Sequence, residues 1–138
     1  VDEQKFYKYR FGGGTTCSSA LKLISKQFEN RFPPNKWNIY VFYFTDGENY
    51  ESDNSEFIQT LKKDFPPNLV NFVGITQIYA YDYRNSVLEN VIKAQKADVL
   101  GENVKTAEIP SNSDTMNEGR NEAVLKAVKD LLGKTKIS

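Results

Sequence analysis

The chain has 138 residues, a length typical of one domain, so we expect a single domain over residues 1–138. Its 18 basic and 18 acidic residues leave no formal net charge, which argues against a nucleic-acid partner or an anionic membrane surface. Histidine is absent and Cys17 is the one cysteine, so histidine-assisted nucleophiles, histidine zinc sites and an internal disulfide are excluded. No apolar run is long enough to span a membrane, and we expect a cytoplasmic protein.

The first part of the chain predicts a helix behind a glycine-rich opening. Residues 1–11 are aromatic and charged, which fits an edge strand or a loop, and residues 12–16, GGGTT, fit a hinge. Ser18 or Ser19 is a suitable N-cap for the helix that follows, and two prolines from Pro33 end it. Apolar residues recur at helical spacing along it: Leu21, Ile24, Phe28 and Phe32.

Three apolar segments predict strands. Residues 38–45 are almost continuously apolar, which favours a strand covered on both faces, and residues 69–80 and 103–109 give two more. Amphipathic patterns predict helices between and after them, at about 55–65, 86–96 and 122–132. This alternation predicts an α/β fold, a Rossmann-like parallel sheet flanked by helices.

Asp46 is the first candidate for chemistry, because ligands bind at the carboxyl ends of strands in open α/β sheets. It lies in TDGEN, directly after the most apolar strand. A carboxylate there suits an oxygen-preferring cation such as Mg²⁺, although Asp46 can equally cap a turn. The other acidic residues nearby are interpreted as a solvated loop and helix start, and they do not fit an EF-hand: Glu48, Glu51, Asp53 and Glu56.

The glycine loop before the first helix has three readings. It can be a hinge, it can cradle an anion with backbone N–H groups, or Thr15 can offer its hydroxyl to a cation beside Asp46. The loop matches neither the P-loop nor the dinucleotide-binding pattern. Cys17 follows the loop, where a helix N-terminus lowers a thiol pKa, but without a histidine to assist it we expect no catalytic role.

These segments resemble a known arrangement. A GGT loop that opens a helix, followed by a buried strand ending in TDG, is similar to the last two metal-binding segments of von Willebrand factor A domains. In more detail, the segments GGTTCSS, NIY, TDGEN and SDN, in this order within residues 13–54, resemble the YhbH/YeaH family. Members of that family are bacterial proteins associated with sporulation and starvation stress, and their carboxyl-terminal part is A-domain-like.

The resemblance implies a metal-ion-dependent adhesion site with Thr15 and Asp46 as ligands. Gly13, Gly14, Ser18, Gly47 and Glu48 would shape the loops around it. The DxSxS ligands of this site occur nowhere in these residues. We therefore expect a fragment of a longer protein, whose full-length form binds Mg²⁺ or another divalent cation that this part alone does not hold.

The resemblance also implies partners. Strand 38–45 would pair with a strand upstream of these residues, so we expect self-association through its exposed edge. A serine kinase and a stage V sporulation protein R relative are the protein partners that the family suggests.

We therefore expect a non-enzymatic, metal-assisted protein–protein interaction module of a bacterial sporulation or stress-response protein. The alternative is a small phosphate-handling α/β enzyme that uses the loop Gly12–Thr16 and Asp46.

Overall fold

The computed structural model describes residues 16–78, 86–109 and 117–133, and the side chains of the last helix from residue 122 onward. The segment predicted as an edge strand or loop and most of the glycine hinge lie outside these residues. In the described part, no helix has the length and apolar character needed to cross a membrane. The elements are α2 (Cys17–Asn30), β1 (Tyr40–Thr45), α3 (Glu51–Asp64), β2 (Phe72–Ile78), α4 (Val87–Lys96), β3 (Val104–Ile109) and α5 (Asn117–Gly133).

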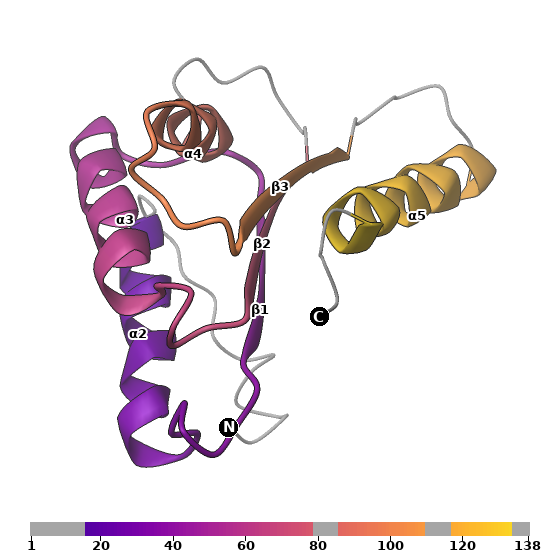
Figure 1. Ribbon diagram of the computed structural model, residues 1–138. Helices are drawn as coiled ribbons and strands as arrows, with labels where there is room; N and C mark the ends of the chain where they lie inside the picture. Colours follow the sequence, from indigo (N-terminus) through magenta and orange to yellow (C-terminus); the bar gives the residue numbers. More distant parts are fainter. Residues whose placement is uncertain (1–15, 79–85, 110–116, 134–138) are drawn as a thin grey trace, which may run out of the picture.

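The three strands form one parallel sheet in the order β1-β2-β3. Tyr40 of β1 lies opposite Phe72, and Val73 of β2 lies opposite Val104 of β3. Helices α2, α3 and α4 cover one face, while α5 lies on the other (Figure 1). The predicted α/β architecture, a parallel sheet flanked by helices on both faces, is confirmed.

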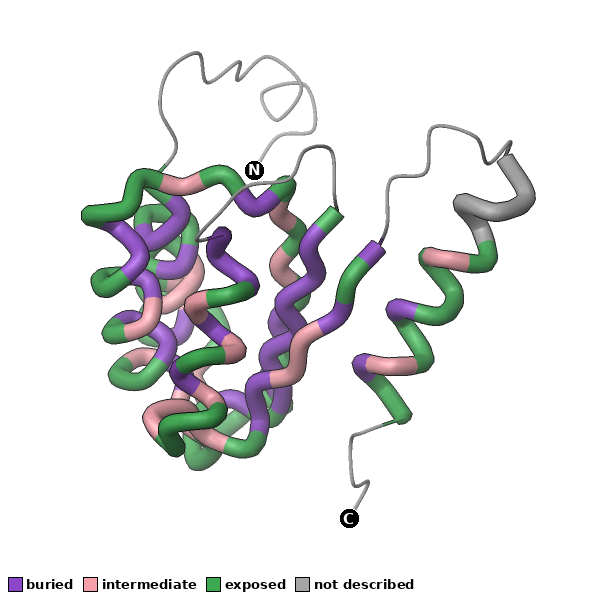
Figure 2. The backbone as a smooth tube through the Cα atoms, turned by 90° about the horizontal axis from the view of Figure 1, so that it is seen from above, coloured by how far each residue is buried: buried purple, intermediate pink, exposed green. Residues whose placement is uncertain are grey.

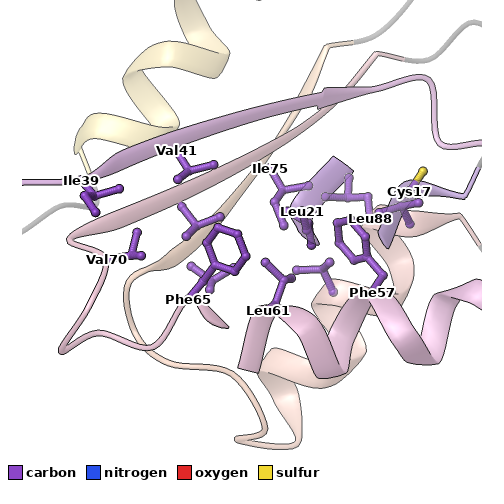
Figure 3. Close-up of a cluster of buried hydrophobic side chains, with 14 of the residues drawn as sticks. Cys17, Leu21, Ile39, Val41, Phe57, Leu61, Phe65, Val70, Ile75 and Leu88 are labelled. Carbon is purple, nitrogen blue, oxygen red and sulfur yellow. The ribbon is translucent and has the colours of Figure 1, made fainter. Parts of the chain in front are cut away.

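The main core lies between the sheet and the three helices of its first face. The central strand β2 is buried at every position except Ile78, as expected of a parallel strand with neighbours on both sides (Figure 2). The helices contribute large apolar side chains that meet the sheet (Figure 3). The largest fully buried side chains include Leu21, Phe57, Leu61 and Leu88 of the helices and Phe65, which directly follows α3.

Helix starts differ from the prediction in an informative way. Thr16, not Ser18 or Ser19, is the N-cap residue of α2, and its side chain makes no capping hydrogen bond. By contrast, Ser86 caps α4 in the usual way, because its side chain accepts the Glu89 N–H at 3.3 Å. The first turn of α2 must therefore find its acceptors elsewhere in the fold.

The prediction that strand 38–45 is covered on both faces is wrong. On the helix-covered face Val41 is buried and Tyr43 is half-buried, but Tyr40, Phe42 and Phe44 are 57%, 49% and 60% exposed. Helix α5 packs on the part of that outer face near β3, in a cluster with Phe72, Ala107, Ile109, Ala127 and Leu131. Among the described residues, no helix packs on the outer face of β1, although the ring of Phe42 contacts that of Phe72.

The exposed outer face of β1 adjoins an unpaired strand edge, because β1 pairs only with β2 in the described sheet. An unpaired, uncharged and aromatic edge strand is a template for pairing with another chain. We expect the chain to self-associate there, so that Phe44→Glu lowers the molar mass measured by light scattering to that of a monomer. The matched control is Leu23→Glu, the same kind of change at a 64% exposed position of α2. A monodisperse monomer before any substitution would contradict this prediction.

Candidate functional site at the carboxyl edge of the sheet

Asp46 follows the last residue of β1, as predicted, and its side chain is exposed. Its Oδ1 accepts the Glu48 N–H at 3.0 Å, and the Gly47 N–H donates to the Thr45 hydroxyl oxygen at 3.0 Å. Two side chains thus fold the backbone into a tight turn. The second carboxylate oxygen of Asp46 has no partner among the described residues. Asp46 is therefore both a turn former and an available ligand.

Gly47 is the residue that lets this turn sit against the sheet. It is buried and has φ +93°, a conformation that L side chains rarely adopt. A Cβ atom there would lie 2.8–2.9 Å from three atoms of the Gln77 side-chain amide. The Gly47 carbonyl also accepts the Val87 N–H at 3.3 Å. The turn is thereby joined to the first turn of α4.

Gln77 belongs to the candidate site, although it was not among the residues predicted from the sequence. It belongs to β2 and is fully buried, and its Oε1 accepts the Leu88 N–H at 3.3 Å. Its Nε2 has no hydrogen-bond partner in the part of the chain that the structure describes. The amide thus lies between Gly47 and the start of α4, behind the Asp46 turn. A long polar residue near the end of an otherwise apolar strand was the available signal.

Asn49 joins the same turn to two helices. Its Oδ1 accepts the Cys17 N–H at 3.0 Å, and its Nδ2 donates to Asn54 Oδ1 at 2.8 Å. One side-chain amide therefore connects the first turns of α2 and α3. These contacts attach the loop that carries Asp46 to α2 and α3.

Asp53 corrects the prediction that the acidic residues after β1 are solvated. It is buried, and its two carboxylate oxygens accept hydrogen bonds from the backbone N–H of Ser18 at 2.9 Å and from its hydroxyl at 2.5 Å. A carboxylate on α3 thereby caps α2 across the fold. Bonds of this kind contribute about 1.5–3 kcal/mol each. The Ser18 side chain, expected to shape the loop of the site, bonds to Asp53 of α3.

The same contacts bear on the anion cradle predicted for residues 12–16. Of the two N–H groups that open α2, that of Cys17 already donates to Asn49 and that of Ser18 to Asp53. A buried carboxylate beside them also repels an anion. The other predicted residues of this loop, Gly13, Gly14 and Thr15, lie outside the described residues.

Cys17 is the first residue of α2 and is buried beside the loop that follows β1. It belongs to the cluster of buried apolar side chains. Its side chain is 2% exposed, and its Sγ donates to the Glu48 carbonyl at 3.4 Å. Burial raises the pKa of the thiol, while hydrogen bonds to Tyr43 and Thr45 act in the opposite direction. The expectation that a helix N-terminus lowers this pKa is wrong, because burial and the nearby carboxylates of Asp53 and Asp46 raise it.

The described residues fit one position of a cation's coordination shell and not a complete shell. Asp46 offers an exposed carboxylate, but both oxygens of Asp53 are engaged with Ser18. Across the described ranges, no three His, Cys, Asp or Glu side chains come together as a metal site. Glu48 is exposed and joins the turn through its backbone. Any further ligand would come from elsewhere.

The conformation of Gly47 predicts a large effect of a small substitution. Gly47→Ala should lower the free energy of unfolding by about 2 kcal/mol, because the backbone strain adds to the contact with Gln77. Urea denaturation followed by circular dichroism measures this. Gly133→Ala is the matched control, since a Cβ there meets nothing within 4 Å. Equal denaturation midpoints for the two variants would contradict the account of the turn.

The raised pKa of Cys17 predicts a loss of stability at alkaline pH. The unfolded thiol ionises near pH 8.5 and the folded thiol at higher pH, so the free energy of unfolding falls as pH rises above about 8.5. We expect a decrease of up to about 1 kcal/mol between pH 7.5 and 9.5, measured by urea denaturation. Cys17→Ser should decrease less over the same interval. A parallel decrease in both proteins would contradict the assignment to Cys17.

Comparison with known proteins gives the chain a family. The family model described as a protein of unknown function, DUF444, matches residues 1–122. UPF0229 proteins of Bacillus thuringiensis (strain Al Hakam) and Bacillus cereus (strain G9842) are each 33% identical over 111 residues, which cover 72% of this chain and 28% of the relative. A UPF0229 protein of Bacillus cereus (strain B4264) is 33% identical over 98 residues, covering 71% of this chain and 24% of the relative.

The chain thus spans about a quarter of the length of the curated relatives it matches. No solved structure matches it. The match over most of the chain shows that it belongs to the DUF444 family of uncharacterised proteins.

Proposed function

We propose that the chain is part of a non-enzymatic interaction module that binds another protein at the carboxyl edge of its sheet. In this proposal Asp46 is one ligand of a divalent cation such as Mg²⁺, and a carboxylate of the partner is another. The proposal includes the likeness to von Willebrand factor A domains and to the YhbH/YeaH proteins of sporulation and stress. It also includes a cytoplasmic location.

The observation that carries the proposal is an exposed carboxylate on a fixed loop. The loop of Asp46 is attached to β2 and α4 through Gly47 and Gln77, and to α2 and α3 through Asn49. A ligand held this way keeps its position without the entropy cost of ordering a mobile loop. Rigid presentation of one free carboxylate oxygen suits recognition through a bound ion.

The chemistry of the other side chains at this edge favours binding over catalysis. The thiol of Cys17 is buried and its pKa is raised, which disfavours the thiolate that a nucleophile needs. The phosphate-handling alternative loses support, because the donors of Cys17 and Ser18 are used within the fold.

The remaining cation ligands belong to the proposal and not to the described residues. Thr15 is the further ligand that the resemblance implies, and the longer relatives have room for additional carboxylate or hydroxyl ligands. A serine kinase or a stage V sporulation protein R relative would be the protein that binds there.

Calorimetric titration with Mn²⁺ tests the cation, run in parallel on this chain and on the full-length protein. With so few ligands, this chain alone should bind at best in the millimolar range. The full-length protein should bind at least tenfold more tightly, and Asp46→Ala should remove that gain. Glu102→Ala is the matched control, because Glu102 is an exposed carboxylate just before β3, at the other end of the sheet.

Tight binding by this chain alone would contradict the proposal that ligands are missing from it. Binding in neither protein would remove the cation from the proposal. Equal effects of Asp46→Ala and Glu102→Ala would move the cation away from the carboxyl edge.

A further inference from the structure

The sheet has a second edge, at β3, and its hydrogen bonds show which backbone groups point outward. The Val73 N–H donates to the Asn103 carbonyl at 2.9 Å, so the backbone groups of residue 103 face β2. Successive residues of a strand direct these groups to opposite sides. Those of Val104, Thr106 and Glu108 therefore face away from the sheet.

One of these outward positions is already closed. Gln95 of α4 donates its Nε2–H to the Val104 carbonyl at 2.8 Å. The N–H and C=O groups of Thr106 and Glu108 have no hydrogen-bond partner in the described part of the chain. The open edge of β3 is therefore a short stretch around Ala107.

A hollow of about 410 Å³ surrounds this open stretch. Helix α4 forms one wall with Leu88 and Ile92, and α5 forms the other with Ala123, Lys126 and Asp130. Thr106, Ala107 and Glu108 form its floor. The wall formed by α4 is thus apolar, and the wall formed by α5 has one small side chain and two charged side chains.

The dimensions favour a short extended peptide over a second copy of the chain. The open stretch offers four backbone groups for pairing, the N–H and C=O groups of Thr106 and Glu108. The hollow around it has the volume of a small-ligand pocket. A stable dimer needs about 1,200–2,000 Å² of buried surface, much more than this stretch provides. Peptides that add a strand to an exposed edge gain affinity from main-chain hydrogen bonds and specificity from alternate side chains.

We propose that the open edge of β3 binds a short extended segment of a partner protein as an added strand between α4 and α5. The segment directs apolar side chains toward Leu88 and Ile92. It directs a basic side chain toward Asp130, the acidic side chain that α5 contributes to the hollow. This site is independent of Asp46, which lies at the end of the other edge strand.

The probe is the fluorescein-labelled peptide acetyl-Thr-Val-Arg-Val-Thr-amide, titrated with the full 138-residue chain in a fluorescence anisotropy experiment. Two further peptides carry N-methyl groups, one on both valine nitrogens and the other on the arginine and last threonine nitrogens. Because alternate N–H groups of a strand face the same side, one N-methylated peptide should lose binding at least tenfold and the other should keep it. Loss by both or by neither would overturn strand addition.

Protein variants locate the peptide. Ile92→Asp should weaken binding at least tenfold by charging the apolar wall, and Asp130→Lys should weaken it several-fold by reversing the charge that meets arginine. Glu122→Lys makes the same charge change at an exposed position of α5 that does not line the hollow, and should leave binding unchanged. Circular dichroism checks that each variant is folded. Equal weakening by Asp130→Lys and Glu122→Lys, or no saturable binding by the unmodified chain, would overturn the proposal.

Discussion

The N-terminal turn of α2 has no capping side chain of its own, and the arrangement of the carboxyl edge depends on how that turn is satisfied. Asn49 and Asp53 supply the missing acceptors from the loop and helix that follow β1. An N–H group left without an acceptor in this buried setting would cost about 1–3 kcal/mol. Two helices and the loop between β1 and α3 are therefore fixed by one requirement, and Asp46 takes its position from them.

A second constraint is the unequal cover of the two sheet faces. Three helices close the first face and bury a continuous apolar core, whereas among the described elements only α5 packs on the second face, near β3. The aromatic side chains on the outer face of β1 are consequently exposed to solvent. Exposed aromatic surface of this kind marks an interaction surface in soluble proteins. Strand β1 is an edge strand of the described sheet and ends at the candidate site. The exposed aromatic surface and the candidate site are therefore neighbours.

The sequence predicted the element order and the parallel sheet, because apolar periodicity and paired prolines are local signals. It missed the role of Asp53, because a carboxylate in an acidic stretch looks the same whether it meets water or the first turn of another helix. The prediction that strand 38–45 is covered on both faces was also wrong, because a run of apolar residues does not show which helices pack on the strand. Gln77 and Asn49 act through neighbours that are distant in the sequence, and spacing alone cannot show such contacts.

The two edges of the sheet differ in chemistry, and this limits how copies of the chain can assemble. Strand β3 carries Lys105 and Glu108 and has one carbonyl closed by Gln95, whereas β1 has no charged residue. Charged side chains and blocked carbonyls discourage the pairing of identical strands. Contact between two β1 edges is isologous, so it uses the same surface on both copies. In the described sheet the remaining edge is β3, whose charges disfavour pairing with an identical strand. If the chain self-associates through β1 as expected, assembly by this route would stop at a pair and would not grow into a fibre.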